Sequence, residues 1–116
     1  MPSLAFRFDD GSSMMAISGD VGFCQSIIDI SANSDLLILE SSFPTSELSN
    51  DTHLTAGEAG KIARLAKAKN LVVKHLYPVC DDYDMKSLIS EEYDGNIIIS
   101  EDLMELELSH GKVSIK

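Results

Sequence analysis

Three short apolar runs, each too short for a helix and bounded by turn residues, constrain the fold of this chain more than any other feature. They cover residues 36–39, 71–73 and 97–99, the last within a predicted strand over 96–100. Continuous apolar runs of this length are typical of strands that are covered on both faces. Stretches with helical periodicity separate them, and the resulting βαβαβ order implies parallel pairing with right-handed crossovers. The sequence therefore predicts an α/β fold.

The predicted helices cover residues 23–32, a segment starting at residue 55, and residues 85–93. The second has the clearest start, because Thr55 and Glu58 match a capping box in which each side chain bonds the backbone of the other. Its small apolar side chains fall on one face, which favours close packing onto a sheet. They are Ala59, Ile62, Ala63 and Ala66.

Antiparallel hairpins are predicted at both ends of the chain. At the N-terminal end, Leu4, Phe6 and Phe8 alternate with polar or small residues, the period of a strand with one buried face. Residues 10–12 then form a turn into a strand over 14–18. At the C-terminal end, 104–108 alternates strictly and turns into 113–115. The expected sheet is therefore mixed, with a βαβαβ core and terminal hairpins.

Composition and charge indicate how many domains the chain can form and which kinds of protein it is not. A chain of 116 residues with 44% hydrophobic residues can form one domain, spanning 1–116. The 19 acidic against 9 basic residues give a net charge of −10, which argues against nucleic acid as anything but a substrate. No apolar run approaches the roughly 20 residues of a membrane span, and no export signal is present, so a cytoplasmic location is expected. Cys24 and Cys80 are expected to be free thiols.

Ionisable side chains follow the predicted strands where those strands end. Asp20 follows the strand over 14–18, Glu40 follows 36–39 and His75 follows 71–73, while His53 precedes a helix. Because the carboxyl ends of parallel strands share one edge, these four groups are expected at one site. Two simpler interpretations stay open: Asp20 as a helix N-cap and His75 as a histidine at the sheet edge whose hydrogen bonds are satisfied without a ligand. His110 is expected to be a turn residue.

Four motifs in order resemble the metallo-β-lactamase superfamily, and within it the branch that contains tRNA 3′-processing ribonuclease Z and related phosphodiesterases. They are Ser18-Gly19-Asp20, residues 36–43, His53-Leu54-Thr55 followed by Glu58-Ala59-Gly60, and His75-Leu76-Tyr77-Pro78. The resemblance implies that Asp20 bridges two metal ions, usually zinc, and that His75 is a terminal ligand of one. It also implies that His53 protonates the leaving group and that Glu40 orients His53.

The chain departs from the family pattern in two ways. Leu54 stands where the family has serine, and Leu39 stands where it has histidine, which favours a general metal-dependent hydrolase over a specific ribonuclease. The chain also lacks the signature His-x-His-x-Asp-His of the first half of the fold. The resemblance therefore implies the C-terminal half of an αββα sandwich, a part of a phosphodiester or ester hydrolase that binds zinc weakly by itself and is inactive alone.

Two further hypotheses accompany this one. Strands that lack their usual cover favour association, so the expected partner is the missing N-terminal half or a second copy, and a homo-oligomer is expected. A noncatalytic, self-associating α/β fragment is accordingly the alternative. A phospho-receiver domain, suggested by Asp9, Asp10 and Lys74, is disfavoured, because Asp10-Gly11-Ser12 predicts a hairpin turn where a receiver has a helix.

Overall fold

The structure is a computed structural model that describes residues 5–9, 11–18, 25–41, 54–75, 83–100, 106–109 and 112–115. Its helices are α1 (Gln25–Ser31), α2 (Ala56–Ala66) and α3 (Met85–Ser90). Its strands are β1 (Ala5–Asp9), β2 (Met14–Ser18), β3 (Leu36–Ser41), β4 (Asn70–His75), β5 (Asn96–Ile99), β6 (Leu106–Ser109) and β7 (Lys112–Ile115).

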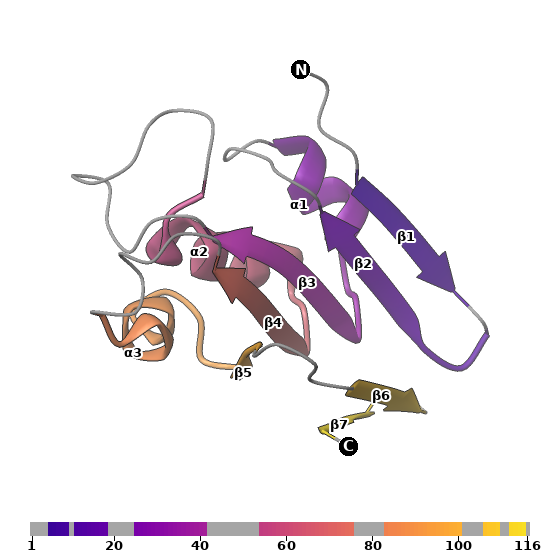
Figure 1. Ribbon diagram of the computed structural model, residues 1–116. Coiled ribbons are helices and arrows are strands. Elements are labelled where there is room, and N and C mark those ends of the chain that lie inside the picture. The colour runs from indigo at the N-terminus through magenta and orange to yellow at the C-terminus, as the bar shows by residue number, and fades with distance from the viewer. Residues whose placement is uncertain are drawn as a thin grey trace.

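One five-stranded sheet organises the molecule, with strand order β1-β2-β3-β4-β5, and β6 and β7 pair separately (Figure 1). β2, β3, β4 and β5 are parallel, whereas β1 is antiparallel to β2. The predicted βαβαβ core and both terminal hairpins are therefore confirmed. The turn after β1 contains Gly11 at φ 89°, a conformation that glycine adopts without strain. Because a strand and not a helix follows β1, the receiver interpretation is wrong.

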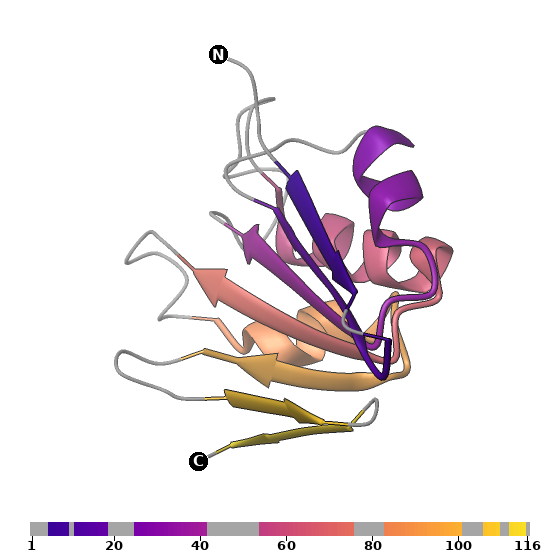
Figure 2. The same ribbon diagram turned by 90° about the vertical axis from the view of Figure 1, so that its right-hand side faces the viewer.

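The hydrophobic core lies between the sheet and the three helices, all on one face. Alternate strand residues such as Leu37, Leu71 and Ile97 enter it and are almost fully buried. Figure 2 shows α1 and α2 on the right of the strands and the yellow β6–β7 hairpin below β5. The molecule is thus one sheet with helices on one side, which is half of an αββα sandwich. In the part of the chain that the structure describes, no helix is long and apolar enough to cross a membrane.

Helix α2 begins where the capping box predicts. Thr55 Oγ1 accepts a hydrogen bond from the Glu58 N–H at 3.2 Å, and Glu58 Oε1 accepts one from the Thr55 N–H at 3.0 Å. The predicted apolar face of the helix is buried, and its cap Lys67 ends it in the left-handed conformation. The start of this helix therefore follows from local sequence, whereas its end at Lys67 had no sequence signal.

Three sequence-based expectations about element limits or burial need correction. Phe6 and Phe8 were expected to be buried, but they are 52% and 53% exposed because nothing among the described residues covers their side of β1. Helix α3 ends at Ser90 and not at residue 93, because the N–H groups of Glu92 and Tyr93 both bond the Ile89 carbonyl in a turn. β3 extends two residues beyond its apolar run, to Ser41.

A buried tyrosine anchors the turn after α3. The Tyr93 hydroxyl donates a 2.8 Å hydrogen bond to the Ala68 carbonyl, which lies between α2 and β4. A Cβ atom added at Gly95 would overlap the Tyr93 ring, so this glycine permits the ring to fold back over its own chain. Burial, with a smaller contribution from the Asp94 charge, raises the pKa of Tyr93 to about 12.

We expect alkaline pH to destabilise the fold through Tyr93. In the unfolded chain the phenol ionises near pH 10.0, whereas the folded state keeps it neutral until about pH 12. The unfolded state then binds fewer protons, so the free energy of unfolding falls as pH rises through that interval. Phenolate absorbance should reveal a group with a pKa of about 12 that disappears in Tyr93→Phe. If the native protein shows no such group, the hydroxyl is not held as described.

Candidate active site at the carboxyl edge of the sheet

The parallel strands end together at one edge of the sheet. β2 ends at Ser18, β3 at Ser41 and β4 at His75. Ser41 pairs with His75, and Glu40 pairs with Lys74. The N-terminus of α2 lies at the same edge, because this helix runs back to the start of β4 (Figure 1). Strand ends and a helix N-terminus therefore meet where α/β folds usually bind their ligands.

Two of the four predicted site residues, Glu40 and His75, are described by the structure and lie at this edge. Glu40 lies within β3 and His75 is the last residue of β4, one position apart in the register of adjacent strands. Asp20 and His53 lie outside the described residues. In the sequence, Asp20 comes two residues after the end of β2, and His53 directly precedes Leu54. The structure thus brings the Glu40 and His75 backbones together, while the roles of all four residues stay predictions.

The side chains of this chain supply only some of the ligands that a pair of metal ions needs. Among the residues that the structure describes, no three His, Cys, Asp or Glu side chains gather into a group that could hold a metal ion. Catalytic zinc normally takes three protein ligands and a water molecule. Asp20 and His75 have suitable donor atoms, but two ligands do not complete such a site. Cys24 and Cys80 lie outside the described residues.

The two departures from the family motifs are core residues. Leu39 is fully buried and Leu54 is 1% exposed, and both belong to the same hydrophobic cluster as Ile62 of α2. Leu54 therefore fixes the chain at the entry to α2, directly after the proposed proton donor in sequence. Both side chains therefore contribute to the packing of the core.

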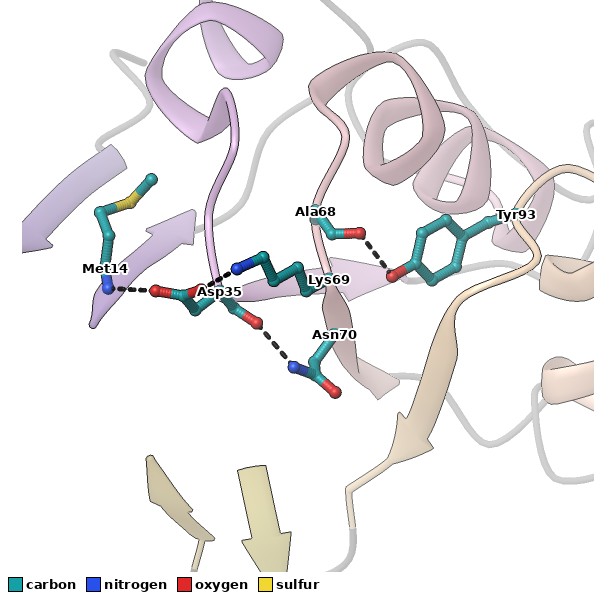
Figure 3. Close-up of polar contacts among 6 residues, drawn as sticks. All are labelled: Met14, Asp35, Ala68, Lys69, Asn70 and Tyr93. Atoms are coloured by element: carbon teal, nitrogen blue, oxygen red, sulfur yellow. Dashed lines mark hydrogen bonds and ion pairs between the residues drawn. The ribbon is translucent and has the colours of Figure 1, made fainter. Parts of the chain in front are cut away.

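Sequence reasoning missed a polar network at the opposite edge, around Asp35 (Figure 3). The Asp35 carboxylate accepts a 2.8 Å hydrogen bond from the Met14 N–H and lies 3.0 Å from Lys69 Nζ. The Asp35 carbonyl accepts a 2.8 Å hydrogen bond from the Asn70 side chain. These bonds tie together the starts of β2, β3 and β4, and so help to set the register that aligns the site. The only local signal was an acidic residue directly before an apolar run.

The chain resembles several known proteins, although no protein-family model matches it. It is 35% identical over 97 residues to ribonuclease Z of Methanosarcina acetivorans and 35% identical over 99 residues to ribonuclease Z of Myxococcus xanthus. These matches cover 80% and 81% of this chain but 32% of each relative. An uncharacterized protein of Mycobacterium tuberculosis is 31% identical over 97 residues.

A solved structure agrees with the sequence relatives. The metallo-β-lactamase fold protein YhfI of Bacillus subtilis superposes with a TM-score of 0.73 and 26% identity, over 97% of this chain and 44% of YhfI. The one-sided sheet is therefore part of a metallo-β-lactamase fold. The chain belongs to the metallo-β-lactamase superfamily, and it spans about a third of the length of its ribonuclease Z relatives. More than half of each relative thus has no counterpart here.

Proposed function

We propose that the chain is part of a metal-dependent hydrolase that cleaves a phosphodiester or a related ester, with its catalytic centre at the carboxyl edge of the sheet. The observation that carries this proposal is the β3–β4 register, which sets Glu40 and His75 one position apart beside the N-terminus of α2. Relatives named ribonuclease Z support the same reaction class.

Each residue has one role in the proposal. Asp20 and His75 would supply part of the ligand set that holds a zinc pair. His53 protonates the departing oxygen, and Glu40 holds the His53 ring in the orientation that this transfer requires. Zinc bound there would supply Lewis-acid activation of the water that attacks the ester.

Residues outside this chain must complete the centre. A two-metal site needs more ligands than Asp20 and His75 provide, even with His53 added. A complementary N-terminal half, in the same polypeptide or a separate one, is the proposed source. Without it the chain is proposed to be inactive, and Phe6 and Phe8 on the helix-free face of the sheet stay 52% and 53% exposed. That exposed apolar face favours the alternative function, a noncatalytic module that associates with a second copy.

We expect the isolated chain to bind zinc weakly, because its ligand set is incomplete. Calorimetric titration with zinc should show no stoichiometric site of sub-micromolar affinity. Fusion to the part of a ribonuclease Z relative that this chain does not match should create such a site, and Asp20→Ala should remove it. Tight binding by the isolated chain that depends on Asp20 would mean that the chain completes a site by itself or by dimerising.

A further inference from the structure

Lys74 places a positive charge next to the carboxyl edge of the sheet. It directly precedes His75, the last residue of β4, and its side chain is exposed. The described strands β2 to β5 contain no other lysine or arginine. One residue of a strand spans about 3.3 Å, which is less than the length of a lysine side chain. The Lys74 ammonium can therefore reach the edge at which β3 and β4 end side by side (Figure 1).

The side chain of Lys74 shares a face of the sheet with that of Glu40. These two residues are partners in the β3–β4 register, and each follows a core residue, Val73 or Leu39, so alternation puts both on the helix-free face. Although the two are neighbours, Lys74 takes part in no hydrogen bond or ion pair among the residues that the structure describes. In the proposed site the Glu40 carboxylate orients His53, which leaves the Lys74 charge to a group outside the chain.

The other basic side chains in the described part of the chain lie elsewhere, and several already have partners. Arg7 donates hydrogen bonds of 3.1 and 3.0 Å to two carbonyl oxygens near the end of α1. Arg64 forms an ion pair of 3.2 Å with an acidic residue that follows α3, and Lys69 lies 3.0 Å from Asp35 at the opposite edge of the sheet. The remaining lysines belong to α2, its C-terminal cap, α3 and β7. Lys74 is therefore the cation that the described strands bring to the proposed catalytic edge.

A cation at this edge matters because the chain as a whole repels anions. Its net charge of −10 opposes the approach of a negatively charged substrate. A phosphodiester carries a negative charge that its non-bridging oxygens share, whereas a carboxylic ester is uncharged. A lysine ammonium is a compact cation that binds phosphate oxygens through charge-assisted hydrogen bonds. Lys74 therefore favours a phosphodiester over an uncharged ester.

We propose that Lys74 binds a non-bridging oxygen of the substrate phosphate and so selects an anionic phosphodiester over an uncharged ester. This inference rests on the proposed hydrolase function, and it adds the charge of the substrate and the residue that recognises that charge. The ammonium binds the phosphate in the substrate and in the transition state alike, so its removal raises KM and leaves kcat nearly unchanged.

Two substrates with the same leaving group test this role. They are bis-p-nitrophenyl phosphate, an anion, and p-nitrophenyl acetate, which is uncharged, and the enzyme is the chain fused to the part of a ribonuclease Z relative that it does not match. Lys74→Met should raise KM for the phosphodiester by about ten- to a hundredfold, the usual effect of losing a hydrogen bond to a charged group. KM for the acetate should stay unchanged. Lys74→Arg keeps the positive charge and should retain most of the native preference.

Lys67→Met is the matched control. Lys67 is also an exposed lysine, but it caps α2 at the end far from the proposed catalytic edge. The same substitution there should change neither KM. Circular dichroism and zinc stoichiometry confirm that each variant folds and holds its metal, and Lys74→Gln replaces Lys74→Met if that variant unfolds.

A binding measurement separates this inference from the hydrolase function. Broadening of the phosphorus NMR line of dimethyl phosphate reports phosphodiester binding without turnover. Lys74→Met should reduce the broadening, whereas Lys67→Met should not. Binding through Lys74 in a fusion that hydrolyses neither substrate would support the role of Lys74 and contradict the hydrolase.

The opposite pattern would overturn the role of Lys74 and leave the hydrolase standing. In that pattern the fusion hydrolyses both substrates, and Lys74→Met changes either both KM values equally or neither. Equal effects on the charged and the uncharged substrate would mean that Lys74 acts on the site through Glu40 and does not bind phosphate.

Discussion

When the complementary half of the fold is supplied, His53→Ala should slow hydrolysis of bis-p-nitrophenyl phosphate by about 10² to 10⁴, the usual contribution of a general acid or base. Zinc should stay bound in this variant, because His53 is proposed to donate a proton and not to bind metal. Asp20→Ala should instead abolish zinc occupancy and hydrolysis together. Metal analysis and steady-state kinetics on the same samples separate the two roles.

The leaving group provides the internal control. A leaving group that departs readily as an anion needs little protonation, so the His53→Ala defect should shrink as the leaving group improves. His110→Ala, a histidine expected in a turn, should behave like the native protein. If His53→Ala released zinc in the same proportion as Asp20→Ala, then His53 would be a ligand and its assignment as proton donor would be wrong.

Gly60→Ala should destabilise the fold by about 1 to 3 kcal/mol, the usual cost of overpacking a tight contact. An added Cβ at Gly60 would lie 2.7 Å from the Ile89 carbonyl oxygen, with the Glu92 Cβ at 3.2 Å. The closest atom is backbone, so α2 and α3 must separate to admit the methyl group. Replacing glycine by alanine within a helix by itself stabilises the helix by about 1 kcal/mol. We expect the free energy lost by separating α2 from α3 to exceed this gain.

Gly57→Ala is the matched control for this contact, because it makes the same substitution in the same helix. No atom lies within 4 Å of a Cβ added at Gly57, so only the backbone effect remains and stability should rise by up to about 1 kcal/mol. Urea unfolding at one fixed protein concentration compares the two variants, since association would otherwise shift the midpoint. Equal and small effects of both variants would show that α2 and α3 do not approach as closely as described.

The sequence predicted those features that depend on neighbouring residues. Apolar runs located β3, β4 and β5, and the alternation βαβαβ implied their parallel order. Thr55 and Glu58 located the start of α2, because both hydrogen bonds of a capping box join residues three apart. Since Glu40 and His75 lie at or next to a strand end, the parallel order was enough to place both at the same edge of the sheet.

For Asp20 and His53, the resemblance to the family supplied the roles, and the described residues do not test them. Periodicity alone could not separate a metal ligand from a helix cap at Asp20, because the same carboxylate at the same position serves both purposes.

Tertiary structure alone decided which surfaces are covered and how the strands align. The alternation in β1 predicts that Phe6 and Phe8 share a face, but whether that face is buried depends on what packs against it. Likewise, Asp35 joins Met14, Lys69 and Asn70 across three strands, a network that no local pattern encodes because its members are distant in sequence. Local hydrogen bonding and periodicity fix the elements of this protein, whereas burial and register arise from contacts between segments far apart in the chain.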